Sequence, residues 1–147
     1  MEILEVADRP PELINQLLEV WENSVRATHL FLSEKEIKSI REYGPQALRE
    51  IAHLMIAEDE AGCAAAFMGI EEGTLEMLFI APRERGKGLG KRLIQYGMEN
   101  YGIKRLAVNE QNPQARGFYE HMGFHVYKRT DHDEQGNPYP LLYMRFE

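Results

Sequence analysis

The sequence predicts an α/β fold in which a mixed sheet of about seven strands is covered by helices on both faces. Short apolar runs bounded by turn-forming residues alternate with longer stretches whose apolar residues recur at helical spacing. The length of 147 residues and the hydrophobic content of 44% suit one domain with a substantial core. We therefore expect residues 1–147 to form a single domain.

The N-terminal third is expected to hold one short strand and two helices. Residues 3–6 have the apolar character of a strand, and two consecutive prolines favour a helix start within residues 10–27. Ser33 and Glu36 have the spacing of a capping box, which predicts that a second helix begins there. Pro45, directly after a glycine, predicts a break or a kink in this second helix.

The middle of the chain carries three strand-like runs, over residues 53–58, 63–70 and 74–80. Short turns that contain Gly62 and Gly73 separate these runs. Connections this short join antiparallel neighbours, so we expect two consecutive hairpins.

The C-terminal half alternates helices and strands. Apolar spacing predicts helices over residues 88–101 and 112–122, and strands over 104–108, 123–129 and 141–146. The first of these helices follows one strand and precedes another, so we expect a parallel crossover at that point.

Composition narrows the function classes. The net charge of −7 and the pI of about 5.3 argue against nucleic-acid binding, which needs a basic face. An acidic surface is compatible with amine substrates, although it also serves solubility in any protein. We expect no membrane association, because no apolar run has the length of a span, and no internal disulfide, because Cys63 is the single cysteine. The first residues lack the features of a signal peptide, so we expect a cytoplasmic protein, with a homodimer left open.

A glycine-rich basic loop between a strand and a helix carries the clearest chemical signal. Such a loop lets backbone N–H groups approach a phosphate, and the helix N-terminus adds partial positive charge. The spacing fits neither the Walker pattern nor the dinucleotide fingerprint. We interpret the loop as a pyrophosphate cradle, with a basic turn that binds no ligand as the alternative. Its glycines and basic residues are Arg83, Arg85, Gly86, Lys87, Gly88, Gly90 and Lys91.

Two blocks of sequence resemble the GNAT family of N-acetyltransferases. The run from Arg85 to Gly90 is similar to the family's acetyl-CoA loop, and residues 106–124 meet every fixed position of its later motif. The predicted order of strands and helices also resembles the GNAT fold along essentially the whole chain. Residues 28–32 and 138–142 look like a small bacterial branch of this family, a weaker likeness that names no substrate.

The resemblance implies that acetyl-CoA is the cosubstrate and lies between two splayed strands. Its pantetheine arm would pair with the backbone of the strand before the loop, as an added strand does. Its pyrophosphate would lie on the loop, with Lys91 at the rim. Asn112 would face the cofactor, or serve only to cap the helix that follows it. The resemblance thus implies these cofactor-binding residues: Leu78, Phe79, Ile80, Arg85, Gly86, Lys87, Gly88, Leu89, Gly90, Lys91, Asn112 and Tyr119.

The same resemblance, together with side-chain chemistry, nominates three catalytic residues. Tyr119 matches the family's tyrosine that serves the leaving thiolate; the alternative is a ring that only packs. Glu76 is the leading base, and strand alternation predicts that it shares a face with Leu78 and Ile80 while the opposite face carries Leu75, Met77 and Phe79. His29 is the second candidate, because histidine titrates near neutrality. The remaining histidines show no metal-ligand spacing with the cysteine, so we expect no metal.

These residues predict an N-acetyltransferase in which a primary amine of a small molecule attacks acetyl-CoA directly. Two alternatives remain open at this stage. The acceptor could be a protein lysine or an N-terminal amine, or the chain could be a non-catalytic acetyl-CoA-binding module.

Overall fold

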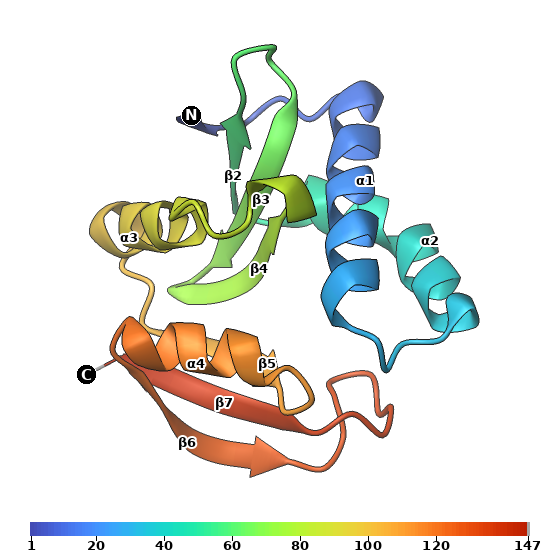
Figure 1. The fold of residues 1–147 in the computed structure, drawn as a ribbon, viewed down its shortest axis with the longest axis vertical. Helices are drawn as coiled ribbons and strands as arrows, with labels where there is room; N and C mark the ends of the chain where they lie inside the picture. The colour runs from blue at the N-terminus through green and yellow to red at the C-terminus, as the bar shows by residue number, and fades with distance from the viewer. Residues whose placement is uncertain (147) are drawn as a thin grey trace.

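The computed structural model describes residues 1–146, which form the α/β arrangement that the sequence predicts. Seven strands make one mixed sheet in the order β1-β2-β3-β4-β5-β7-β6, with helices on both faces (Figure 1). The elements are β1 (Glu2–Glu5), α1 (Pro11–Thr28), α2 (Glu34–Glu50), β2 (His53–Glu58), β3 (Ala64–Glu71), β4 (Thr74–Ile80), a 3₁₀ turn (Pro82–Glu84), α3 (Leu89–Tyr101), β5 (Arg105–Asn109), α4 (Pro113–His121), β6 (Phe124–Thr130) and β7 (Leu141–Phe146).

Two apolar clusters form the core, one on each face of the sheet. Helices α3 and α4 cover one face, where the fully buried Met68 and Leu93 belong to the same cluster. Helices α1 and α2 cover the other face, where Phe67 is 2% exposed and packs 5.5 Å from Phe79 between ring centroids. Helices α1 and α3 each present an apolar stripe to the sheet, as the periodicity predicts.

The sheet opens between β4 and β5. All other neighbouring strands pair antiparallel, whereas β4 and β5 are parallel, as the predicted crossover requires. Their register includes Thr74 with Arg105 and Leu75 with Leu106, and pairing stops there. Beyond Leu75, the backbone of β4 that faces β5 therefore has no strand partner. Figure 1 shows the resulting separation, with β5, β6, β7 and α4 below the N-terminal elements.

A β-bulge at Glu76 changes which β4 side chains share a face. Leu75 pairs with Ile70 and Met77 pairs with Gly69, so Glu76 is an extra residue without a partner on β3. Leu75 consequently packs in the α3/α4 cluster, whereas Met77 packs in the α1/α2 cluster. The prediction that these two residues share a face is wrong, because the extra residue reverses the alternation.

Helix α2 begins where the capping box predicts and continues past its proline. The Ser33 hydroxyl accepts from the Glu36 amide, and the Glu36 carboxylate accepts from the Ser33 amide. Pro45 lies inside the helix, which excludes the predicted break. Leu48, beyond Pro45, is 3% exposed, and its burial in the core helps to offset the hydrogen bond that proline removes. Within residues 1–146, no helix combines the length and the apolar character needed to cross a bilayer.

Candidate active site

An open cleft of about 470 Å³ lies between α1, β4, the glycine-rich loop and α4. Its walls include every residue that the resemblance assigned to acetyl-CoA, apart from Lys87, and also His29. Sequence reasoning did not select the remaining lining residues, which are Ser24, Thr28, Glu84, Gln114, Ala115 and Phe118.

The loop backbone is shaped by two glycines with left-handed dihedrals. Gly86 has a φ of 75° and Gly88 a φ of 79°, a region that side chains disfavour. A Cβ atom at either position would meet no protein atom within 4 Å, so both residues border open space. Gly88 also precedes α3 and gives it no side-chain cap, which leaves the first amides of that helix available to an anion.

Of two charged side chains in the loop, one lies outside the cleft and the other lines it. Lys87 does not line the cleft and instead pairs with Glu84, 3.6 Å between Nζ and Oε2. Arg85 lines the cleft, and its Nη2 donates to the Ser24 hydroxyl at 3.3 Å. Ser24 is only 3% exposed and lies on the buried face of α1. In the sequence, only the polar character of Ser24 among the apolar positions of α1 pointed to this contact, and it did so weakly.

A smaller cavity of about 140 Å³ occupies the opening between β4 and β5, and we call it the gap cavity. His29, Glu76 and Tyr119 all line it, so the structure brings the three candidate catalytic residues to one space. They come from the end of α1, from the bulge of β4 and from α4.

Tyr119 presents a hydroxyl that has no hydrogen-bond partner among residues 1–146. Its ring lies 5.2 Å from Phe118 and 6.2 Å from Phe124 between centroids. Burial raises the pKa of the Tyr119 hydroxyl far above its usual value, so the phenol keeps its proton. Asn112, at the start of the same helix, accepts from the Ala115 amide at 3.2 Å, which confirms its capping role.

The two base candidates have pKa values shifted in opposite directions. Desolvation raises the pKa of Glu76, and the nearby carboxylates of Glu134 and Glu71 raise it further. Desolvation lowers the pKa of His29, with a smaller effect from the positive charge of Arg85. Both shifts favour the neutral form, which for histidine is the form able to accept a proton. The Nδ1 atom of His29 lies 2.8 Å from the Thr28 hydroxyl.

A third cavity, of about 450 Å³, continues the gap cavity on the side away from the glycine-rich loop, and we call it the outer cavity. The two share Leu75, Glu76, Leu106 and Ala107. The gap cavity also shares residues with the cleft, among them His29 and Tyr119. The cleft, the gap cavity and the outer cavity therefore adjoin one another, in that order from the glycine-rich loop. Among the described residues, no group of three or more His, Cys, Asp or Glu side chains could hold a metal ion.

Comparisons with known proteins place the sequence and the fold among acetyltransferases. A family model described as an acetyltransferase (GNAT) domain matches residues 50–126. Peptidyl-lysine N-acetyltransferase YjaB of Salmonella typhimurium is 39% identical over 127 residues, covering 86% of this chain and 87% of the relative. The solution structure of apo-form YjaB from Escherichia coli is 35% identical, with a TM-score of 0.87 over 99% of this chain and 98% of that one.

A more distant structure shares the fold. The paia N-acetyltransferase from Thermoplasma acidophilum was solved in complex with coenzyme A. It is 24% identical with a TM-score of 0.72, over 99% of this chain and 100% of that one. The extent of the family match and the identity to the Salmonella relative are sufficient to assign the family. This chain belongs to the GNAT family and is an acetyl-CoA-dependent N-acetyltransferase.

Proposed function

We propose that this enzyme transfers the acetyl group of acetyl-CoA to the ε-amino group of lysine side chains in proteins. The observation that carries the proposal is the row of adjoining cavities, in which the gap cavity shares lining residues with both the cleft and the outer cavity. An acceptor nitrogen that enters from the outer cavity reaches the gap beside Glu76 and Tyr119. A lysine side chain is long and unbranched, so it suits a passage of this kind.

The relatives favour a protein acceptor over the small-molecule amine that the sequence first suggested. The Salmonella relative is named a peptidyl-lysine acetyltransferase. Glu76 and Glu134 line the outer cavity together with the cation Arg105, and neither carboxylate has an ion-pair partner among the described residues. Unpaired carboxylates attract a cationic side chain, which supports lysine in its protonated form as the group that arrives.

In this proposal the pantetheine arm of acetyl-CoA pairs with β4 at Leu78, Phe79 and Ile80, beyond the point where β5 stops pairing. The pyrophosphate lies on the loop from Arg85 to Gly90, with Lys91 at the rim. Lys87 is assigned to this site through its backbone, because its side chain pairs with Glu84. Asn112 keeps its capping role and faces the cleft.

The reaction proceeds by direct attack. Glu76, or His29 in its place, accepts one proton from the lysine ammonium, either directly or through water. The neutral amine attacks the thioester carbonyl, and the oxygen gains negative charge that an unpaired backbone N–H of β4 can stabilise. The carbon–sulfur bond then breaks, and Tyr119 donates its proton to the thiolate. The second proton that nitrogen loses restores the tyrosine, so the products are acetyl-lysine and coenzyme A.

The test is a panel of lysine peptides with blocked N-termini, matched peptides with a free N-terminus and no lysine, and simple primary amines. Free thiol release and the mass of each product are measured with acetyl-CoA. We expect acetylation of the lysine peptides, with higher kcat/KM than for any small amine. If only N-termini or only small amines are acetylated, that group, and not the lysine side chain, is the acceptor. Binding of acetyl-CoA without thiol release for any of these acceptors would refute lysine side chains as the acceptor.

A further inference from the structure

Two distant segments meet at one side of the active site. Phe31, in the turn between α1 and α2, lies 5.4 Å from Tyr139 between ring centroids. The Tyr139 hydroxyl also donates to the Glu36 carboxylate at the start of α2. We call Phe31, Glu36 and Tyr139 the clasp. It joins the two segments, residues 28–32 and 138–142, in which the sequence shows a likeness to a bacterial branch, and none of its three residues has a part in the proposed reaction.

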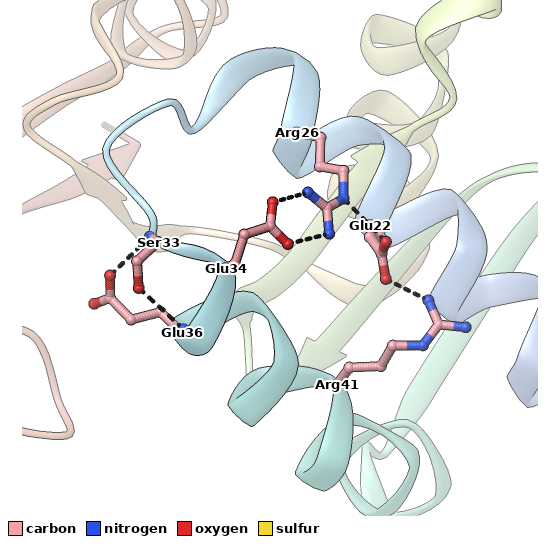
Figure 2. Close-up of polar contacts among 6 residues, drawn as sticks. All are labelled: Glu22, Arg26, Ser33, Glu34, Glu36 and Arg41. Atoms are coloured by element: carbon pink, nitrogen blue, oxygen red, sulfur yellow. Dashed lines mark hydrogen bonds and ion pairs between the residues drawn. The ribbon is translucent and has the colours of Figure 1, made fainter.

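The α2 side of the clasp is also held by contacts that do not involve Tyr139. One oxygen of Glu36 accepts from the Ser33 amide in the capping box, and the other accepts from Tyr139. Figure 2 shows the neighbouring ion pairs that hold this corner to α1. Arg26 binds Glu34 through two nitrogens, and Glu22 pairs with both Arg26 and Arg41. A carboxylate held in this way is a pre-oriented acceptor for a single hydroxyl.

The connection that carries Tyr139 also contributes residues to the wall of the outer cavity, although Tyr139 itself does not line it. Asp133, Glu134 and Gln135 line that cavity and lie on the same connection between β6 and β7. The Asp133 carboxylate accepts from the Gln135 and Asn137 amides, which makes a defined turn. The Tyr139 amide donates to the Asn137 carbonyl at 2.7 Å, so the clasp and the cavity wall belong to one hydrogen-bonded unit.

The clasp also contacts a residue of the gap cavity. Phe31 lies 5.4 Å from the ring of His29, which lines that cavity. The ladder between β4 and β5 is short, so the clasp provides a second connection between the α1/α2 layer and the strands beyond the gap. Movement of Tyr139 would therefore displace the outer wall and widen the route along which an acceptor reaches the gap.

We propose that Tyr139 is a positioning residue whose contacts with Phe31 and Glu36 set the width of the acceptor entrance and so favour unbranched primary amines. The inference rests on the proposed acceptor route, and it predicts effects on the acceptor rather than on acetyl-CoA. Tyr139 touches no reacting atom in this scheme. Its influence passes through the segment that it holds.

The test compares Tyr139→Ala, which removes ring and hydroxyl, with Tyr139→Phe and Glu36→Gln, which weaken only the hydrogen bond. Glutamine can still serve a capping box, so Glu36→Gln leaves the start of α2 intact. Tyr101→Phe is the matched control, because the Tyr101 hydroxyl donates to Glu5 at a site away from the clasp and the three cavities. Steady-state kinetics use a lysine peptide, a linear alkylamine and an alkylamine branched beside the nitrogen.

For Tyr139→Ala we expect the acceptor KM to rise about tenfold and the preference for linear over branched amines to fall about tenfold, the scale of a one-methylene change in a pocket. The acetyl-CoA KM stays within about twofold, because none of the clasp residues lines the cleft. The two milder variants change in the same direction by less, and they decide the matter if Tyr139→Ala does not fold. Tyr101→Phe behaves as the parent.

Unchanged acceptor KM and amine preference in folded variants would overturn the role of Tyr139, as would an equal rise in the acetyl-CoA KM. Failure of lysine peptides as substrates is a separate result. It would refute the proposed acceptor class, while the linear and branched amines still test the clasp. A protein that acetylates none of these acceptors contradicts both proposals.

Discussion

Tyr119→Phe separates a catalytic hydroxyl from a packing ring. The substitution removes one oxygen and keeps the ring contacts with Phe118 and Phe124. The hydroxyl makes no hydrogen bond within residues 1–146, so its loss breaks no bond in the fold. We therefore expect the free energy of unfolding to stay within about 0.5 kcal/mol of the parent.

The expected kinetic loss is much larger than the change in stability. A positioned acid contributes about 10²-fold or more, so turnover of Tyr119→Phe should fall by at least that factor. This loss equals about 2.7 kcal/mol of transition-state stabilisation, at 1.36 kcal/mol per tenfold. Acetyl-CoA affinity should change little, because the hydrogen bond to sulfur strengthens only as the thiolate forms. A residual rate is expected, since a thiolate can leave unprotonated.

The direction of the pKa shift adds a second, independent expectation. Burial raises the pKa of Tyr119, so the parent keeps this proton throughout the usual assay range and shows no loss of activity from its ionisation below about pH 10. The assay is steady-state thiol release with one good acceptor, beside thermal melts of parent and variant. Equal turnover in a normally folded Tyr119→Phe would remove the residue from the mechanism.

Three further outcomes are expected. Glu76→Gln should remove the acidic limb of the pH–rate profile, which lies at higher pH than for an ordinary glutamate, because a base works only when deprotonated. Because the raised pKa of Glu76 means that the fold opposes its charged form, the variant should also have a slightly higher Tm at neutral pH. A pH–rate profile that changes only in His29→Ala would reverse the order of the two base candidates. Acetyl-CoA at about 100 times its Kd should raise the Tm of the parent by roughly 5–10 °C. Gly88→Asp should abolish this shift, because it places a negative charge where the pyrophosphate would bind, in a space with no protein atom within 4 Å of the new Cβ. Phe67→Ala should lower the free energy of unfolding by about 3–5 kcal/mol in urea titrations, because this ring is 2% exposed; a loss below 1 kcal/mol would mean that the core collapses around the cavity.

The features that the sequence predicts well are those that depend on neighbouring residues. The capping box at Ser33 follows from a spacing of three residues and forms as expected, and Asn112, directly before Pro113, takes the capping role that its position allowed. The glycine-rich loop is likewise contiguous, so its left-handed glycines and the uncapped start of α3 follow from a short run of chain. The order of the elements follows from periodicity, which reports the local burial of each segment.

Contacts between distant segments had only weak signals. Arg85 is assigned to a phosphate by its motif, yet its side chain also reaches Ser24, 61 positions away in sequence. Phe31 and Tyr139 stand out only as parts of two likenesses, and nothing in either segment indicates that the rings meet. Pro45 is the reverse case, because here the local sequence strongly predicts a break that does not occur. Helix α2 continues through Pro45, since residues on both sides of it pack in the core.

The bulge at Glu76 shows why the site depends on the whole sheet. A regular β4 would put Glu76 on one face with Leu78 and Ile80, and the side chain would compete with apolar groups that pack against α3 and α4. The bulge takes Glu76 out of the ladder, so its carboxylate lies at the junction of the gap and outer cavities while Leu75 fills the core. The extra residue is defined only by the register against β3. The same bulge, next to the point where β5 stops pairing, therefore places the candidate base between the gap cavity and the outer cavity, on the proposed acceptor route.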